Sequence, residues 1–270
     1  MPIPENTASL FLCRTNLIKD PALLGRYRAL LDAEELARLE RYRLERDRHT
    51  FLISHALVRT ALSEFADTSP AAWRFRRNRH GRPEIENQTS PPLRFSLSHT
   101  RDLVACAVSG TTEVGLDVEA IDDKTEILAL AERYFAPLEV AALRALPSGK
   151  QRDRFIALWT LKEAYAKARG LGLSLPLHAA AFRIETELIE PNFNTQAAEE
   201  PSQWSFILMQ PDPGRWLSLA ARTGSASGFR LNAQWFHPLT NQNQTEECPM
   251  VAATNHFQGV AWSRQSGSNR

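Results

Sequence analysis

The sequence predicts an α+β protein, a pseudo-symmetric pair of similar lobes, each a small, mostly antiparallel sheet with packed helices. Two observations predict this class. Each half of the chain runs from a strand-like segment through segments of helical periodicity to further strand-like segments. The polar stretch from Ser109 to Thr112 separates the halves. This order favours two α+β lobes over a doubly wound parallel sheet.

The same patterns divide the chain into three regions. We expect an N-terminal lobe over residues 1–111, a C-terminal lobe over residues 112–238 and a tail over residues 239–270. From about Thr240 the chain turns to Asn, Gln, Ser and Gly, a composition that forms no core. The tail is therefore expected to be disordered and dispensable.

Individual elements are assigned from periodicity and turn signals. In the first lobe, strands are expected over residues 10–17, 73–76, 95–98 and 103–108, with helices between 23 and 65. Asp32 followed by Glu35 matches a capping box. In the second lobe we expect strands over 114–118, 181–184, 204–208 and 216–220, helices over 125–135 and 137–146, a helix around Trp159 that Gly170 ends, and a loop over 187–202.

Composition excludes several classes of protein. The chain has 270 residues, of which 43% are hydrophobic and 23% charged, so most of it should fold. No apolar run approaches the roughly 20 residues of a membrane span, and the first residues lack a secretory signal. Three cysteines lie far apart without metal-binding spacing. We therefore expect a reduced, cytoplasmic protein that does not enter a membrane.

Charge is unevenly distributed. From Arg38 to Arg82 there are eleven arginines against five acids, which indicates either solvated helix faces or a wall for a polyanion, such as nucleic acid or a nucleotide with several phosphates. Only five lysines occur, and Lys162 and Lys167 share one six-residue window. This clustering favours a functional site in that window.

A pair of acids suits a metal ion. Asp117 and Glu119 alternate with Leu116 and Val118 on a strand, so both carboxylates leave one face while the apolar pair faces a core. Two carboxylates on one face repel unless a cation lies between them, and Mg²⁺ prefers such oxygen ligands. The alternative is a solvent-facing strand edge.

Two further groups extend this site. Glu163 and Lys167 lie four residues apart and share a helix face, which is typical either of a site or of a surface salt bridge. Ser98 and His99 end a strand, where a hydroxyl and an imidazole suit phosphate binding; alternatively, His99 is structural. Ser98 lacks the glycine pattern of a nucleophile elbow.

Four motifs in order resemble those of the two-lobed 4′-phosphopantetheinyl transferases that activate carrier proteins of surfactin-type synthetases. They are Gly81-Arg82-Pro83, the segment from Phe95 to Thr100, the segment from Gly115 to Glu119 and the segment from Trp159 to Gly172. The resemblance covers roughly residues 10–235. A lysine frequent in this family near the start of the first long helix is absent, since Glu45 falls near that position and Arg43 or Arg46 would substitute.

The resemblance implies coenzyme A as donor and Mg²⁺ or Mn²⁺ as cofactor. The implied metal ligands are Asp117, Glu119 and Glu163; the implied cofactor-binding residues are Arg59, Arg82, Ser98, His99, Lys162 and Lys167. The implied catalytic residues are Glu163 and Lys167. Glu163, directly or through a metal-bound water, would accept the proton of the attacking serine, and Lys167 would contact the pyrophosphate.

The resemblance also implies the reaction and its partners. The 4′-phosphopantetheine group would pass from coenzyme A to a serine of an apo acyl or peptidyl carrier protein, and 3′,5′-ADP would leave. We expect a monomer that binds no nucleic acid. The competing hypotheses are a basic nucleic-acid-binding protein and another Mg²⁺-dependent nucleotide-processing enzyme; the sequence has neither a Walker loop nor a kinase glycine loop.

Overall fold

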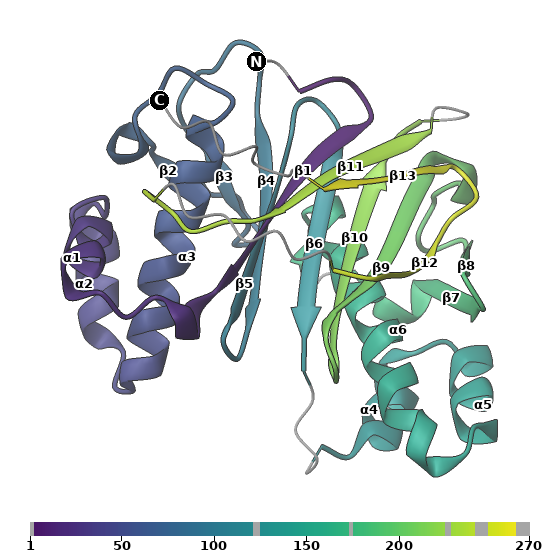
Figure 1. Cartoon of the computed structure of the whole chain (residues 1–270). Helices are drawn as coiled ribbons and strands as arrows, with labels where there is room; N and C mark the ends of the chain where they lie inside the picture. Colours follow the sequence, from purple (N-terminus) through teal and green to yellow (C-terminus); the bar gives the residue numbers. More distant parts are fainter. Residues whose placement is uncertain (1–2, 121–124, 173–174, 225–227, 241–247, 263–270) are drawn as a thin grey trace.

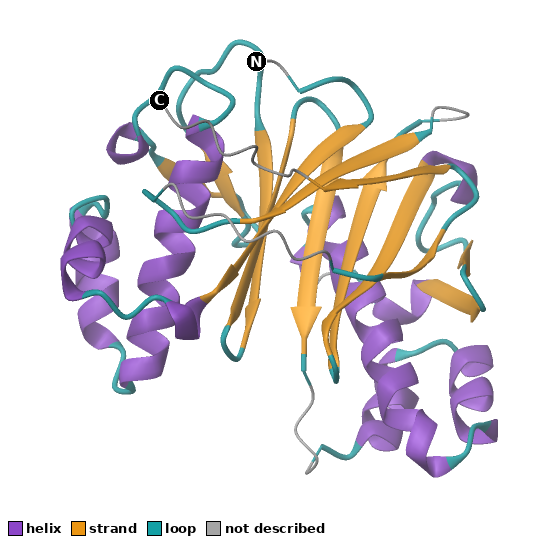
Figure 2. Cartoon of the chain, viewed as in Figure 1, coloured by secondary structure: helices purple, strands orange, loops and turns teal. Residues whose placement is uncertain are grey.

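The computed structural model describes residues 3–120, 125–172, 175–224, 228–240 and 248–262. Two sheets lie side by side at the centre of the molecule, and helices cover their outer sides (Figures 1 and 2). This arrangement confirms the α+β class and the two-lobed organisation. The residues predicted to form the active site come from both lobes, so their arrangement depends on where these two sheets meet.

The first lobe is built on a sheet of strand order β13-β11-β1-β5-β4. Its elements are β1 (Thr7–Arg14), α1 (Pro21–Arg28), α2 (Ala33–Arg41), α3 (Glu45–Ser63), β2 (Phe75–Arg77), β3 (Pro83–Ile85), β4 (Arg94–Thr100) and β5 (Leu103–Ser109). Helix α3 packs its apolar face on the sheet, against side chains such as Phe11 and Cys106. Asp32 and Glu35 form the expected capping box of α2, so the sequence placed this helix start correctly.

The second lobe is built on a sheet of strand order β6-β10-β9-β12-β8-β7. Its elements are β6 (Glu113–Glu119), α4 (Ile127–Tyr134), α5 (Pro137–Ala145), α6 (Ser148–Arg169), β7 (Ala180–Glu185), β8 (Leu188–Phe193), β9 (Trp204–Asp212) and β10 (Arg215–Arg222). Gly170 ends α6 in the left-handed conformation (φ 64°), as expected. The expected loop over residues 187–202 is wrong in part, because β8 lies within it and pairs with β7.

A third core lies between the two sheets. Leu10, Leu12 and Ala105 of the first sheet pack against Leu116 and other apolar side chains of the second. The two lobes therefore share one continuous apolar interface, and the helices lie on the far side of each sheet (Figure 2). This interface fixes the position of one lobe relative to the other.

Strand β6 shows the alternation that the sequence predicts. Leu116 and Val118 point into the core between the sheets, whereas Asp117 lies on the opposite face, where its carboxylate pairs with Lys167 of α6. Gly115 on the same face allows α6 to approach: a Cβ there would lie 2.0 Å from the Ala164 carbonyl oxygen. Close packing of α6 on β6 brings helix and strand carboxylates into one region.

The C-terminal region differs from expectation. Strand β11 (Phe229–Trp235) pairs parallel to β1 and so belongs to the first sheet. Strand β12 (Met250–Ala253) lies between β9 and β8, and β13 (Phe257–Trp262) pairs parallel to β11 (Figure 1). The division at residue 238 and the disordered tail are therefore wrong for residues 248–262; residues 241–247 and 263–270 lie outside the described residues. These pairings also make two of the first sheet's ladders parallel.

No helix in the described parts of the chain has the length and apolar character needed to cross a membrane. Cys13, Cys106 and Cys248 are buried and form no disulfide with one another.

Candidate active site

The candidate site begins at the seam between β4 and β6, the edge strands of the two sheets. The Ser98 hydroxyl on β4 donates to Asp117 Oδ1 over 2.9 Å and accepts a hydrogen bond from the Val118 N–H over 3.3 Å. Lys167 Nζ on α6 lies 2.7 Å from Asp117 Oδ1 and 2.9 Å from Ser98 Oγ. The seam therefore brings together residues from both lobes, and it commits the Ser98 hydroxyl to protein partners.

The carboxylates around this seam are partly buried and repel one another, and both effects raise pKa values. Burial, followed by the negative charge of Asp117, raises the pKa of Glu119 to about 7. The same two causes raise the pKa of Glu163. Asp117 Oδ2 is buried without a hydrogen-bond partner among the described residues. Three acids thus share a region in which Lys167 is the cation that lowers their charge repulsion.

These residues fit a hard divalent cation by their chemistry. All the donors are carboxylate oxygens, which Mg²⁺ and Mn²⁺ accept, and the unpartnered Asp117 Oδ2 is available as a ligand. In the described residues, however, no three such side chains already converge on one point. Closing the set around an ion would require side-chain movement of Glu119 or Glu163, and Lys167 now neutralises Asp117.

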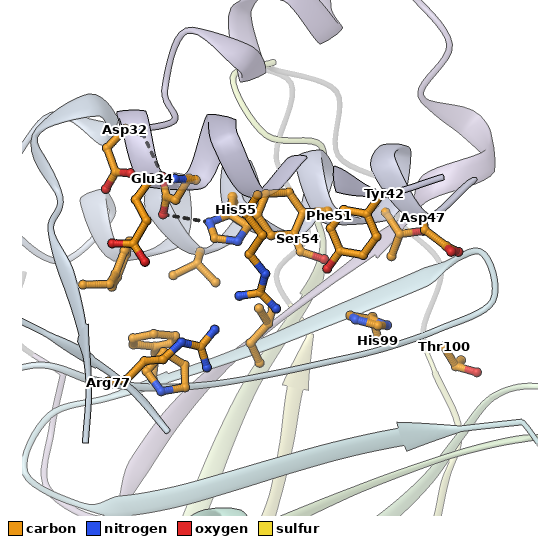
Figure 3. Close-up of a pocket in the computed structure, with 18 of the residues that line it drawn as sticks. Asp32, Glu34, Tyr42, Asp47, Phe51, Ser54, His55, Arg77, His99 and Thr100 are labelled. Carbon is orange, nitrogen blue, oxygen red and sulfur yellow. Dashed lines mark hydrogen bonds and ion pairs between the residues drawn. The ribbon is translucent and has the colours of Figure 1, made fainter. Parts of the chain in front are cut away.

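A pocket of about 970 Å³ opens in the first lobe next to the seam. Its walls come from α2, α3, the β2–β3 hairpin and β4, with Asp32 and Glu34 toward one end and His99 and Thr100 toward the other (Figure 3). Aromatic rings form part of the α3 wall, where the Phe51 and His55 rings lie 4.1 Å apart, centroid to centroid. Its size and mixed lining suit a nucleotide-sized ligand.

The pocket carries both signs of charge. Five arginines line it, Arg38, Arg46, Arg76, Arg77 and Arg101, together with six acids, Asp32, Glu34, Glu35, Asp47, Glu86 and Asp102. Ser54 also lines it, and its Oγ is buried without a hydrogen-bond partner among the described residues. The expected basic wall therefore exists in part, but acids interrupt it.

His99 connects the pocket to the seam. The ring lines the pocket, and burial, followed by the positive charge of Lys167, lowers the pKa of His99. The imidazole is thus neutral at pH 7 and can donate one hydrogen bond and accept another.

Arg59 does not occupy the expected position. Its side chain is fully buried, and its guanidinium lies 2.5 Å from Glu35 Oε2 and donates to the Trp73 carbonyl oxygen over 2.7 Å. It is not among the residues that line the pocket. The expectation that Arg59 contacts coenzyme A is corrected, because its charge is neutralised inside the first lobe.

The expectation that Lys162 binds the cofactor is corrected as well. Its side chain is fully buried in the second lobe and lies 2.7 Å from Glu139 Oε2. One residue along an α-helix is a turn of about 100°, so Lys162 and Glu163 face different directions. A ligand in the seam or pocket therefore cannot contact Lys162.

Arg82 bridges the lobes. It donates to the Ala168 carbonyl oxygen over 3.1 Å and to the Val114 carbonyl oxygen over 3.2 Å. It thus ties the β2–β3 hairpin to α6 and β6 and lies outside the pocket lining. Of the two proposed substitutes for the family lysine, Arg46 lines the pocket and Arg43 does not.

Comparison with known proteins agrees with this geometry. The family model of the 4′-phosphopantetheinyl transferase superfamily matches residues 113–220, and that of the N-terminal 4′-phosphopantetheinyl transferase region matches residues 23–111. A putative 4′-phosphopantetheinyl transferase of Synechocystis sp. is 35% identical over 255 residues, covering 93% of this chain and 94% of that protein. HetI of Nostoc sp. is 29% identical, with coverages of 88% and 97%. Sfp of Bacillus subtilis is 30% identical, with coverages of 60% and 70%.

These matches define the class as a phosphopantetheinyl-transferring enzyme. The chain belongs to the 4′-phosphopantetheinyl transferase superfamily. The match of two adjoining family regions is consistent with the two-lobed arrangement.

Sequence reasoning missed several pocket residues. Ser54, His55 and Phe51 lie on α3 within an apolar run, which reads as core-facing. The available signal was polarity: a serine and a histidine in adjacent positions interrupt this run. Glu139 was missed because its partner Lys162 follows it by more than twenty residues.

Proposed function

We propose that this enzyme transfers the 4′-phosphopantetheine group from coenzyme A to a serine of an apo carrier protein and releases 3′,5′-ADP. The observation that carries the proposal is the continuity between the nucleotide-sized pocket and the carboxylates and Lys167 of the seam, joined at His99. The nucleotide would occupy the pocket, and the pyrophosphate would extend past His99 to the seam.

The residues would divide the chemistry as follows. The serine oxygen attacks the β-phosphorus, the bond from that phosphorus to the bridging oxygen breaks, and the electron pair leaves with 3′,5′-ADP. Glu163, which lies one helical turn before Lys167 on α6, would accept the serine proton. Lys167 places a positive charge beside the leaving phosphate, and neutral His99 donates a hydrogen bond to a phosphate oxygen. These groups act mainly by positioning and charge stabilisation.

The divalent cation belongs to this proposal. Asp117, Glu119 and Glu163 would hold Mg²⁺ or Mn²⁺, which would neutralise the pyrophosphate when bound. Asp117 would exchange Lys167 for the ion as its main counter-charge, which frees the ammonium for phosphate. The buried, unpartnered Asp117 Oδ2 supports this exchange.

We propose further that the enzyme acts as a cytoplasmic monomer on a small nucleotide rather than on nucleic acid. Three buried thiols suit a reducing compartment. All candidate site residues come from one chain. The acids that interrupt the arginines of the pocket disfavour a long polyanion, which needs a continuous basic surface.

The proposal is tested by incubating the protein with coenzyme A, Mg²⁺ and apo carrier proteins of fatty-acid, polyketide and peptide-synthetase type. Mass spectrometry should show the addition of one phosphopantetheine group to at least one carrier, together with 3′,5′-ADP. Absence of the product from every carrier, with a folded protein, would refute the proposal.

A further inference from the structure

Lys162 and Glu139 form an ion pair that the proposed reaction does not use. Both side chains are almost completely buried, at 0% and 2% exposure, and Lys162 Nζ lies 2.7 Å from Glu139 Oε2. The pair joins α6 to the start of α5 within the apolar core of the second lobe, where the ammonium also lies 5.1 Å from the centre of the Phe135 ring. Isolated charges are rarely retained at such depth without a defined arrangement of partners.

Every hydrogen-bonding group of the pair has a partner. The Lys162 ammonium donates to the carbonyl oxygens of Leu177 and Ala180, over 3.0 and 2.5 Å, in addition to Glu139. Glu139 Oε1 accepts from the Phe182 N–H, and Oε2 accepts from the Ala136 N–H at the start of α5. One ion pair therefore ties α6 to α5 and to the beginning of β7.

The candidate catalytic groups lie on another side of α6, because Glu163 and Lys167 follow Lys162 at about 100° and 140° around the helix. Thr160 lies 2.8 Å from Ser218 on β10, and Gly115 of β6 leaves no space for a Cβ against the helix backbone. These contacts fix how closely the helix approaches the sheet. The Lys162–Glu139 pair adds a contact on another side of the helix, and contacts on two sides together resist rotation of the helix about its axis.

We propose that the Lys162–Glu139 pair is a positioning device that sets the rotation of α6 and thereby places the Glu163 carboxylate and the Lys167 ammonium. The inference rests on the proposed function of Glu163 and Lys167. A rotation of about 10° would move a side-chain end about 6 Å from the helix axis by roughly 1 Å. Misplacement of this size can lower a rate by roughly a hundredfold.

A stabilising role alone explains the pair poorly. Buried ion pairs often contribute little net stability relative to apolar side chains of similar volume, whereas their directional bonds fix one geometry. Burial lowers the pKa of Lys162 against the opposing effect of Glu139, so the ammonium depends on that carboxylate. An apolar side chain in place of Lys162 would fill the space but would not make these directional bonds.

The test uses Lys162→Met and the double variant Lys162→Met/Glu139→Gln, in which no buried charge is left unpaired. Mn²⁺ binding is measured by electron paramagnetic resonance with coenzyme A present and no carrier protein. We expect Mn²⁺ affinity and kcat to fall by about tenfold to a hundredfold, as for other residues that orient metal ligands. Binding of 3′,5′-ADP without metal should stay at the wild-type value, because its pocket lies in the first lobe.

Arg154→Met is the matched control. Arg154 lies eight residues earlier on α6, about 80° from Lys162 around the helix. It donates to the Ile184 carbonyl oxygen of β7 over 2.7 Å. Its loss also removes a tie between α6 and β7, but farther from Glu163. We expect a lower melting temperature with unchanged Mn²⁺ affinity.

Three results would overturn the proposal: wild-type Mn²⁺ affinity and kcat in the folded double variant, an equal fall in Arg154→Met, or failure of both Lys162 variants to fold at low temperature. The last result would make the pair a folding determinant. Failure of the proposed function itself appears separately, as wild-type protein that binds Mn²⁺ but modifies no carrier protein.

Discussion

Lys162 and Lys167, five positions apart on α6, have opposite surroundings. Lys162 is sealed in the second lobe against Glu139, whereas Lys167, about one-third exposed, reaches Asp117 in the seam. Because the two lysines are close in the sequence, they were predicted to belong to one functional site. Helix geometry separates them, because five residues correspond to a rotation of about 140° beyond a full turn. Charged residues that are neighbours in the sequence can therefore have different roles, one within the core and the other in the candidate active site.

The seam acids give the first prediction. Asp117→Ala should abolish transfer, since it removes the carboxylate that both Lys167 and a divalent cation would contact. The fold should persist, because removing one acid relieves the repulsion that raises the pKa of Glu119 and Glu163. Mass spectrometry of the carrier protein and thermal unfolding measure the two effects. Transfer at the wild-type rate would remove Asp117 from the site.

The pocket arginines give the second prediction. Arg46→Ala should raise the KM for coenzyme A by about tenfold to a hundredfold, the value of one charge-assisted bond to phosphate, with a smaller effect on kcat. Arg43→Ala is the matched control, because Arg43 lies three residues earlier and outside the pocket lining. Steady-state kinetics with coenzyme A and its 3′-dephospho form measures the effect. Equal behaviour of the two variants would place the nucleotide elsewhere.

The buried Glu35–Arg59 pair gives a prediction of pH dependence. Burial alone would raise the pKa of Glu35, but hydrogen bonding and charge from His55, with Asp32 and Arg59, lower it to about 2. A lowered pKa means that Glu35 stabilises the fold above pH 4.5 and loses this effect as pH falls toward 2. At pH 7, Glu35→Gln should therefore be less stable by about 3 kcal/mol, since Arg59 is left without its counter-ion.

Urea unfolding at a series of pH values measures this difference. We expect the gap between wild type and Glu35→Gln to narrow below pH 4.5. Glu34→Gln serves as the control, because the described residues show no ion pair for this neighbouring carboxylate. A gap that stays constant down to pH 3 would contradict the assignment of the ionised Glu35 to the Arg59 pair.

At the scale of single elements, local periodicity and turn residues predicted which face of a strand is buried and where a helix ends. The alternation of Leu116 and Val118 with Asp117 identified both faces of β6, and Gly170 identified the end of α6. The burial of Arg59 could not be predicted in this way. Its partner Glu35 lies on another helix, so their contact depends on how α2 and α3 pack. Pairing across elements is a tertiary property that no window of the sequence contains.

Close packing of α6 on β6 gives the fourth prediction. Gly115→Ala should destabilise the protein strongly and lower activity, because the new Cβ would lie 2.0 Å from the Ala164 carbonyl oxygen and 2.3 Å from the Ala168 nitrogen. Relief requires α6 to move, and Glu163 and Lys167 would move with it. Thermal unfolding and the transfer rate measure both effects. Gly149→Ala, where the added Cβ meets nothing within 4 Å, is the control. Equal stability of the two variants would contradict this packing.

At the scale of the whole molecule, the two lobes were predictable but their connections were not. Each lobe reads locally as strand, helices and strands. The return of β11 and β13 to the first sheet joins Thr7 to Arg230 and Arg230 to Gly259, pairings between distant segments. A tail composition rich in Asn, Gln and Ser hides two short strands, because edge and inserted strands obtain their stability from neighbours rather than from their own propensity.

The C-terminal strands therefore give the last prediction. Strand β12 is inserted between β9 and β8 of the second sheet, and β13 extends the first sheet beyond β11, so one short segment contacts both lobes. Truncation after residue 247 removes both strands. Phe257, which lies against the fully buried Phe229 ring, is lost with them, as is Ala252 of the second lobe's core. We expect a loss of about 5 kcal/mol from apolar side chains exposed on both sheets, and hence a melting temperature lower by about 10–20 °C. The activity of the truncated protein should fall with temperature before that of the full chain, because the seam between β4 and β6 depends on how the two sheets are held together. A variant that ends at Trp262 keeps both strands and is the control for chain length. Equal melting temperatures for the full chain and the form ending at residue 247 would show that β12 and β13 add nothing to the stability of the two sheets, as a dispensable tail would.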